Sequence, residues 1–322
     1  MPFLGRARYN LLQQKKREDP SFKVEDWMVV NYRDFSLNEL FDGLERIGVH
    51  LDVDDFEQLA EEYDSPEEFS TKFVDSIPEH AEEIYLYIFE LWRRLLDQRE
   101  TISIFCDEID YLLSEVDEEH LVDGDLMHAM LVELADILDC NVDSGQKPKK
   151  VFSQVCSYMA HDLESAIYNF IFDQIEQGNL TIASELLGDF SEYIEESLWF
   201  DFLKIRLMRG VPSEDATAMM ARFMEKLEER PNLELYFALL RHLIEIGDRD
   251  LFLATYRFAV DLIKDEEDYV EMTDILFEYF NLNDLEEEEK NIRTIIESRK
   301  SRNPSEIISP EDKDQLNQLA SS

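Results

Sequence analysis

The sequence predicts an all-α fold, in which an acidic helical bundle is followed by antiparallel helix pairs stacked in a row. Glycine and proline number only nine each in 322 residues, too few for the turns of an all-β or glycine-looped α/β fold. Apolar residues recur at helical spacing along most of the chain. In the second half, glycines that can end helices recur at nearly regular intervals.

Residues 1–23 form a basic N-terminal arm in an otherwise acidic chain. The arm holds six basic and two acidic side chains, whereas the whole chain has a net charge of −43. Its few apolar residues predict a frayed amphipathic helix. Because a basic arm can bind an acidic surface, we take five of its side chains as candidate partner-binding residues: Arg6, Arg8, Lys15, Lys16 and Arg17.

Residues 24–140 are predicted to form a compact acidic bundle. Residues 36–39 (Ser-Leu-Asn-Glu) have the pattern of a capping box, and Ser65-Pro66 opens a second helix with proline at its first position. The helix expected over 78–98 carries two adjacent apolar stripes, which predicts a central place in the bundle. Two further helices are expected over 100–116 and 119–140.

Two segments are predicted to lie outside the helical domains. Residues 141–150 (Asn-Val-Asp-Ser-Gly-Gln-Lys-Pro-Lys-Lys) combine glycine, proline and serine with a local switch to basic charge, which indicates a linker. Residues 301–322 are polar and contain Pro304 and Pro310. They are predicted to form a mobile polar tail, with one short helix beginning at Ser309.

Residues 151–300 are predicted to form a helical-repeat domain. Helical stretches end at Gly178, Gly210 and Gly247, which are 32 and 37 residues apart. Glycine adopts the left-handed conformation that commonly follows a helix. The helices are expected over 180–195, 197–210, 213–229, 232–247, 249–264 and 267–281.

Helix pairs at this interval resemble tetratricopeptide repeats, whose unit is about 34 residues. The resemblance covers roughly residues 164–300, about four units, and Ala183 and Ala259 lie where such a unit has small residues. Larger or charged residues stand at the other four positions of this kind: Phe190, Asp215, Arg222 and Phe252. The resemblance implies an α-solenoid with an extended binding surface. A distorted helical bundle would leave a similar pattern and is the alternative.

Motifs for catalysis or cofactor binding are missing from the sequence. A calcium-binding loop starting at Asp52 would need glycine sixth and glutamate twelfth, where the chain has Glu57 and Tyr63. Residues 43–48 have glycines at P-loop spacing but lack the lysine and hydroxyl residue that must follow. No G-x-S-x-G, H-E-x-x-H or C-x-x-C occurs. We therefore predict no catalytic residue, no metal site, no cofactor and no enzymatic activity.

The remaining histidines and cysteines have structural explanations. Asp117 with His120 and Asp125 with His128 each have the spacing of one helical face, and we expect solvated side chains at helix ends. Cys156 and His161 are expected to take part in packing between helices. The three cysteines, which also include Cys106 and Cys140, make no disulfide framework, which predicts a reducing, cytoplasmic location. No apolar run is long enough for a transmembrane helix.

The acidity indicates the class of partner. Residues 24–146 hold six basic and 35 acidic side chains, and residues 147–322 hold 19 and 37. Such a field repels nucleic acid and anionic lipid and attracts basic proteins, so we expect neither nucleic acid nor membrane as a partner. Acidity also keeps proteins soluble, which is the simplest alternative explanation. Residues 92–94 (Trp-Arg-Arg) are an isolated basic spot, expected to be a buried tryptophan flanked by arginines that pair with carboxylates.

These observations favour a non-catalytic protein–protein interaction protein, that is, an adaptor, scaffold or chaperone. Its acidic helical surface would bind a partner protein, through a basic segment of that partner. Three alternatives stay open. Residues 1–23 can mediate self-association or mask the acidic body, the N-terminal half can hold a His/carboxylate metal site of an enzyme, or the acidic surface can mimic nucleic acid.

Overall fold

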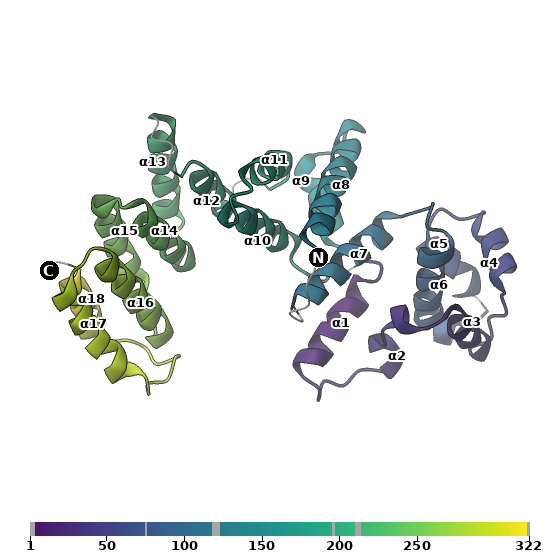
Figure 1. The fold of residues 1–322 in the computed structure, drawn as a ribbon. Coiled ribbons are helices and arrows are strands. Elements are labelled where there is room, and N and C mark those ends of the chain that lie inside the picture. The colour runs from purple at the N-terminus through teal and green to yellow at the C-terminus, as the bar shows by residue number, and fades with distance from the viewer. Residues whose placement is uncertain (1–3, 75, 118–122, 195–196, 210–213, 321–322) are drawn as a thin grey trace. The chain divides into compact units, whose positions relative to one another are not determined.

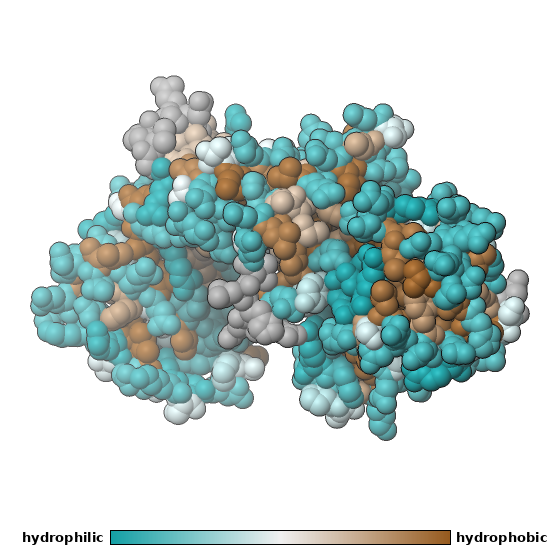
Figure 2. Space-filling model, turned by 45° about the vertical axis from the view of Figure 1, so that its right-hand side comes forward, coloured by the Kyte–Doolittle hydropathy of each residue, from teal (hydrophilic) through white to brown (hydrophobic). Residues whose placement is uncertain are grey.

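The computed structural model describes residues 4–74, 76–117, 123–194, 197–209 and 214–320. Within these ranges the chain forms eighteen α-helices, two short 3-10 helices and one isolated β-bridge between Asp265 and Ile307 (Figure 1). The all-α prediction is confirmed. None of the described helices is long and apolar enough to cross a bilayer. Hydrophilic residues cover most of the face shown in Figure 2, and hydrophobic residues reach it in separate patches.

The chain divides into two compact units. Unit 1 contains Met1–Phe170 with Gly188–Glu195, and unit 2 contains Ile171–Leu187 with Glu196–Ser322. The helices of unit 1 are α1 (Ala7–Glu18), α2 (Asp26–Val29), α3 (Leu37–Arg46), α4 (Val53–Ala60), α5 (Pro66–Val74), α6 (Ala81–Leu95), α7 (Ile102–Asp117), α8 (Gly124–Asp143) and α9 (Pro148–Cys156), with 3-10 helices η1 (Tyr32–Asp34) and η2 (Pro78–His80). Residues of α10 (Leu163–Glu176) and α11 (Leu180–Phe190) belong to both units.

The remaining helices belong to unit 2 and pack in pairs. They are α12 (Leu198–Leu207), α13 (Glu214–Glu229), α14 (Leu233–Ile246), α15 (Arg249–Leu262), α16 (Glu266–Leu282), α17 (Glu286–Arg299) and α18 (Pro310–Leu319). Helix α12 packs on α13, α14 on α15, and α16 on α17, while α14 also packs on α16. The predicted close packing of adjacent helices is therefore present in this unit.

Helix α6 is the centre of unit 1, as its two apolar stripes predict. It packs against α3 and α5, and Ile84, Ile88 and Trp92 along it are fully buried. Tyr32 of η1 meets Tyr87 of α6 edge to face, with ring centroids 4.9 Å apart. Full burial of such side chains contributes about 1.5–3 kcal/mol each, so α6 organises the core of this unit.

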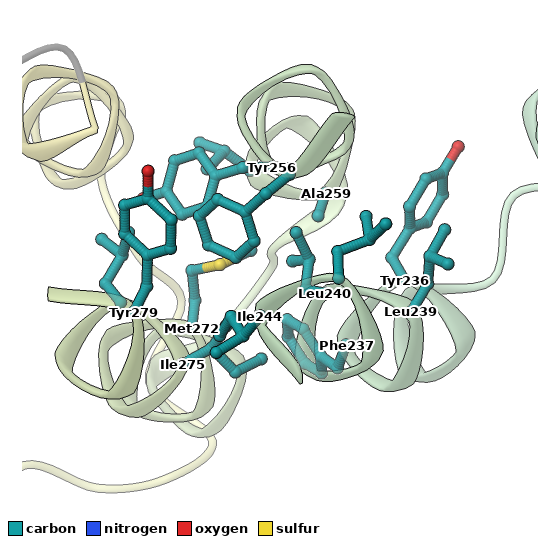
Figure 3. Packing of buried hydrophobic residues seen from close by; sticks show 14 of the residues in the cluster. Tyr236, Phe237, Leu239, Leu240, Ile244, Tyr256, Ala259, Met272, Ile275 and Tyr279 are labelled. Carbon is teal, nitrogen blue, oxygen red and sulfur yellow. The ribbon is translucent and has the colours of Figure 1, made fainter. Parts of the chain in front are cut away.

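The core of unit 2 lies between α14, α15 and α16 (Figure 3). Phe252 of α15 stacks on Tyr279 of α16 with ring centroids 4.1 Å apart and planes inclined by 5°. Leu240 of α14 and Ala259 of α15 are fully buried, and Figure 3 shows them next to each other. The small side chain of Ala259, which fits the tetratricopeptide pattern, thus lies at a helix–helix contact.

Helix ends follow the predicted capping signals. The Ser36 side chain accepts the Glu39 amide while the Glu39 carboxylate accepts the Ser36 amide, which confirms the capping box. Gly178 and Gly247 have φ of 81° and 75°, in the left-handed region where glycine is favoured. Asp248 then caps α15 by accepting the Leu251 amide at 3.1 Å, so two adjacent residues end α14 and start α15. Gly210 lies outside the described residues.

The boundary between the units differs from the predicted linker 141–150. Helix α8 continues to Asp143 and α9 begins at Pro148, so the break is a short turn at Gly145, whose φ is 96°. Val151 and Phe152 of α9 are buried, and α9 packs on α8 within unit 1. The basic and glycine-containing composition therefore marks a turn between packed helices, and the division into units falls within α10.

The C-terminal segment also differs from the predicted mobile tail, because α18 packs on α15. Ser309 and Asp312 form a second capping box at its start, which agrees with the predicted helix onset. Leu316 and Leu319 are buried, and the Tyr256 hydroxyl donates to the Leu316 carbonyl at 3.1 Å. Two buried apolar side chains one helical turn apart and a hydrogen bond to the backbone thus attach this short polar helix to unit 2.

Candidate functional site

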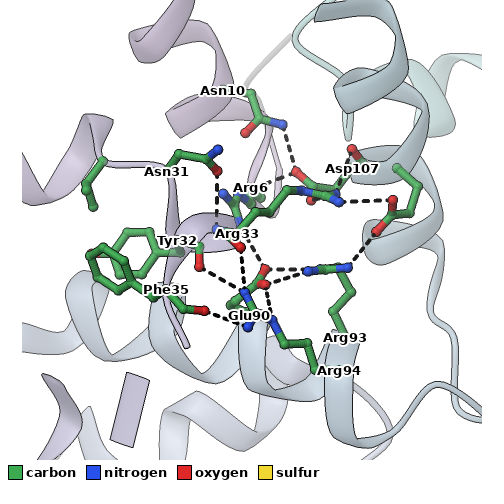
Figure 4. A network of polar contacts seen from close by, with 12 residues as sticks. Arg6, Asn10, Asn31, Tyr32, Arg33, Phe35, Glu90, Arg93, Arg94 and Asp107 are labelled. Carbon is green, nitrogen blue, oxygen red and sulfur yellow. Dashed lines mark hydrogen bonds and ion pairs between the residues drawn. The ribbon is translucent and has the colours of Figure 1, made fainter. Parts of the chain in front are cut away.

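The basic arm is folded into unit 1 as helix α1, so its candidate residues do not form one exposed surface. Arg6 is only 3% exposed and lies between two buried carboxylates (Figure 4). Its Nη1 is 3.6 Å from Oε2 of Glu90, and its Nε is 3.4 Å from Oδ1 of Asp107. Because both carboxylates are also buried, Arg6 neutralises charge in the interior of unit 1 and is not available to bind a partner protein.

The other four candidate residues of the arm lie at or near the surface. Arg8 is half exposed and pairs with Glu82 at 3.1 Å. The Lys16 ammonium donates to two backbone carbonyls of the turn after α1, at 2.8 Å each. Lys15 and Arg17 are exposed in the last turn of α1, where positive charge complements the helix dipole.

Four arginines and three carboxylates make a nearly balanced buried network around Arg6 (Figure 4). The members are Arg6, Arg33, Arg93 and Arg94 with Glu90, Asp107 and Glu108. Arg93 and Arg94 bind the Glu90 carboxylate at 2.5 and 2.6 Å. Trp92, the residue before them in α6, is fully buried. The predicted role of the Trp-Arg-Arg spot is therefore confirmed.

The electrostatics of this network favour its charged form. Burial alone would raise the pKa of the Glu90 carboxyl, but the hydrogen bonds and charges of Arg93, Arg6 and Arg94 hold it below the usual value. Burial likewise raises the pKa of the Asp107 carboxyl, but the charges of Arg6 and Arg33 outweigh burial and hold this pKa below its usual value. Each charge of the network lies beside at least one opposite charge, and these ion pairs fasten α1, η1, α6 and α7 together.

The histidine–carboxylate candidates do not assemble into a metal site among the residues described. His161 Nδ1 lies 2.9 Å from Asp110 Oδ1, and the same carboxylate accepts the amides of Ala160 and His161. His128 stacks on Phe170, and His120 lies outside the described residues. No group of three or more potential metal ligands occurs in the described ranges.

Unit 2 contains a cleft of about 580 Å³ with many charged residues in its lining, here named the acidic groove. It is lined by α12, α14 and α16, the first helices of three successive pairs, and by the end of α10. Two guanidinium groups, from Arg206 and Arg241, face it. Six carboxylates also line it: Glu176, Glu234, Glu245, Glu267, Asp268 and Glu271.

Two aromatic rings and Ala238 form the apolar part of the acidic groove, and a buried arginine packs on one of the rings. Phe172 comes from α10 and Phe237 from α14. The guanidinium of Arg206, which is 5% exposed, lies 4.9 Å from the centroid of the Phe172 ring. Arg206 pairs with Glu176 and, at 3.4 Å, with Glu245. The charge of Arg206 is therefore held inside the groove and shared between two carboxylates, whereas the Arg241 side chain is partly exposed.

Unpaired negative charge remains at the surface of the acidic groove. Arg241 pairs with Glu271 at 2.7 Å, and the Asp268 carboxylate accepts the Lys264 amide at 2.8 Å. Glu234 and Glu267 are exposed and have no ion-pair partner in the part of the chain that the structure describes. These two residues lie on α14 and α16, helices that pack on each other.

Like-charge crowding extends to a carboxyl next to the groove. Burial raises the pKa of Asp274 on α16, the Glu271 carboxylate raises it further, and Arg241 opposes the rise. A cation bound in the acidic groove would relieve such repulsion. The groove is thus suited to hold a positive charge, such as that of a lysine or arginine side chain.

The sequence predicted an acidic surface and a basic partner, but it did not single out the groove residues. One signal was present: Glu234, Phe237, Arg241 and Glu245 are spaced by three and four residues and so lie along one face of α14. With 74 acidic side chains in the chain, this spacing recurs too often to identify a site. The packing of α14 on α16 brings Glu267, Asp268 and Glu271 to the same groove.

Comparisons with protein-family models, curated proteins and solved structures find no match for this chain. The properties of the acidic groove that bear on function are its concave shape, its two aromatic rings and its exposed carboxylates, two of which have no ion-pair partner among the described residues.

Proposed function

We propose that this chain is a non-catalytic protein–protein interaction protein, an adaptor, scaffold or chaperone, whose acidic groove binds a basic segment of a partner protein. The observation that carries the proposal is the lining of the groove, where first helices of successive pairs present six carboxylates against two guanidinium groups. Stacked helix pairs that form a tetratricopeptide-like array use the same kind of concave surface for binding.

The groove residues suggest how a basic segment is held. Glu234 and Glu267 offer exposed carboxylates to incoming lysine or arginine side chains, and the surrounding negative field accelerates their approach. Phe172 is partly exposed and can pack against the alkyl part of a basic side chain, whereas Phe237 is 7% exposed and belongs to the core of unit 2. Charge therefore brings the segment to the groove, and the ring of Phe172 adds an apolar contact.

The thiols are consistent with a protein of the reducing cytoplasm, which is where we place this function. Cys106, Cys140 and Cys156 are all free in the structure. Burial raises the pKa of the Cys156 thiol to about 12, so it remains protonated at neutral pH. A partly buried, protonated thiol of this kind takes part in packing and is a poor nucleophile.

A titration of the full chain tests the proposal. The probe is a synthetic peptide of about twelve residues in which arginine and serine alternate, and its control replaces each arginine with glutamate. We expect one basic peptide to bind per chain in isothermal titration calorimetry, with measurable affinity at physiological salt. Binding of several peptides per chain that disappears at this salt would indicate adsorption to a generally acidic surface and would contradict the proposal.

A further inference from the structure

A second concavity of unit 2, of about 700 Å³, lies between α13 and α15 and is rich in methionine. We name it the methionine groove. Four of the ten methionines of the chain line it, Met208, Met219, Met220 and Met224, so it concentrates a residue that is otherwise sparse. Larger apolar side chains from Ile205, Ile246, Leu251 and Phe258 and three alanines also line it.

Part of this apolar lining reaches the surface. Ile246 and Phe258 are 42% and 44% exposed, and Met219, Met220 and Met224 are partly exposed along one side of α13. Large apolar side chains that line a concavity are typical of protein-binding surfaces. Methionine has a flexible, unbranched and polarizable side chain that adapts to different apolar partners. A trough between two helices is also the geometry into which an amphipathic helix packs.

The floor of the methionine groove carries no positive charge at neutral pH. His242 is 2% exposed and lies at the groove, where burial lowers its pKa to about 4, with a further contribution from Arg206 and Arg209. Arg209 also borders the groove, but its guanidinium pairs with Glu245 at 3.0 Å. The surface available to a partner helix is therefore apolar at its base.

The border of the methionine groove is acidic. Glu228 on α13 is exposed and has no ion-pair partner among the described residues, and Asp248 lies on the opposite side at the start of α15. Their charge favours a partner helix with basic residues beside its apolar face. It disfavours a second copy of this chain, whose net charge is −43.

The two grooves of unit 2 adjoin along α12 and α14. Glu245 lines the acidic groove, Arg209 lines the methionine groove, and these two residues form an ion pair. A single partner with a basic segment next to an amphipathic helix could therefore occupy both grooves. Two adjacent sites joined by a short linker bind more tightly than either does alone.

We infer that the methionine groove binds an amphipathic α-helix of the partner protein, with its apolar face on the methionines and its basic residues toward Glu228 and Asp248. The basic character of this helix rests on the proposed function, whereas the apolar contact with Met220 and Met224 does not. The two parts can therefore fail separately.

Methionine methyl NMR on the full chain tests this inference. The probe is an 18-residue peptide of leucine and lysine arranged as an amphipathic helix, and the control peptide has the same composition in an order without an apolar face. In chain labelled with ¹³C at the methionine methyl groups, we expect the helical peptide to shift the resonances of Met219, Met220 and Met224. The resonances of Met272, buried in the core, and of Met28 in unit 1 should not shift.

Paired substitutions separate the two grooves. Met220→Gln with Met224→Gln keeps side-chain length while removing apolar surface, and we expect it to weaken the helical peptide at least tenfold. The same variant should bind the arginine–serine peptide like the wild type, and Met28→Gln serves as the control. Because both methionines are partly exposed, the variant should fold, which circular dichroism checks.

Each result decides between the two claims. Equal binding of the helical and scrambled peptides, with no selective shift at Met219, Met220 or Met224, would overturn the methionine groove as a helix site. Retained binding of the arginine–serine peptide in that case would leave the proposed function intact. Failure of the arginine–serine peptide together with selective methionine shifts would instead overturn the acidic groove alone.

Discussion

Arg299 and Glu266 form a buried, two-point ion pair inside unit 2. Arg299 Nε donates to Glu266 Oε1 at 2.6 Å, Nη2 donates to Oε2, and the side chains are only 4% and 3% exposed. The same guanidinium lies 3.7 Å from the Tyr269 ring centroid and pairs with Asp312 at the start of α18. One residue at the end of α17 thus links α16, α17 and α18.

Arg299→Met should destabilise unit 2 strongly. The substitution leaves Glu266 buried with only Arg302, at 3.5 Å, as a remaining cationic partner among the described residues. Removal of one member of a buried pair costs about 3–5 kcal/mol. Urea denaturation followed by circular dichroism measures the loss. Lys300→Met removes an exposed cation at the next position and should change stability by less than about 1 kcal/mol.

Stability should fall in acid through Asp312. Burial opposes ionisation, but hydrogen bonds from Arg299 and Ser309 dominate and lower the pKa of this carboxyl from 3.8 to about 2. A depressed folded-state pKa stabilises the fold above the unfolded value, and this stabilisation is lost as the pH falls from about 4 to 2. Asp312→Asn should be less stable at pH 6 and should show a smaller decrease over this window. If the free energy of unfolding of Asp312→Asn decreased between pH 4 and 2 as much as that of the wild type, Asp312 would not be the group responsible for the loss of stability in acid.

Gly43→Ala should destabilise unit 1 although alanine favours helices. A Cβ added at Gly43 would lie 2.4 Å from ring atoms of Tyr87, which is itself buried against Tyr32. We expect a loss of about 1–3 kcal/mol from overpacking, measured by urea denaturation. Gly188→Ala in α11 is the matched control, because an added Cβ there would meet no atom within 4 Å apart from its chain neighbours and the backbone of its own helix. That variant should gain up to about 1 kcal/mol.

Arg6→Met tests whether the basic arm is structural. Glu90 retains Arg93 and Arg94, and Asp107 retains Arg33, so we expect a loss of about 2–3 kcal/mol in the free energy of unfolding. Lys15→Met, which changes the same charge at an exposed position, should have little effect. Equal stability of the two variants would show that Arg6 does not contribute through the buried network.

Local signals in the sequence predicted most of the helices, because caps and apolar spacing act over a few residues. Ser36, Gly247 and the apolar face of α6 are examples. Long-range contacts could not be predicted in the same way. Arg6 looks like part of a polar arm until Glu90 and Asp107, more than eighty residues away, are brought around it. Leu316 is likewise an isolated apolar residue until Tyr256 packs beside it.

The acidic groove likewise combines features that the sequence predicts with features that depend on long-range packing. Its charge and the class of its partner follow from composition, whereas its residues depend on how α12, α14 and α16 pack. Glu234 and Glu267 combine a position on this concave surface with an exposed carboxylate that has no ion-pair partner among the described residues. Position in the fold, rather than charge alone, is therefore the property to test.

The most direct test compares two double variants of equal charge. Glu234→Gln with Glu267→Gln neutralises two exposed carboxylates of the acidic groove, and Glu278→Gln with Glu306→Gln neutralises two exposed carboxylates of unit 2 outside it. In calorimetric titration with the arginine–serine peptide, the groove variant should bind about tenfold more weakly than the wild type, and the control variant should bind like it. Equal weakening in both variants would mean that the peptide responds to overall charge, and would contradict a specific basic-segment site in the acidic groove.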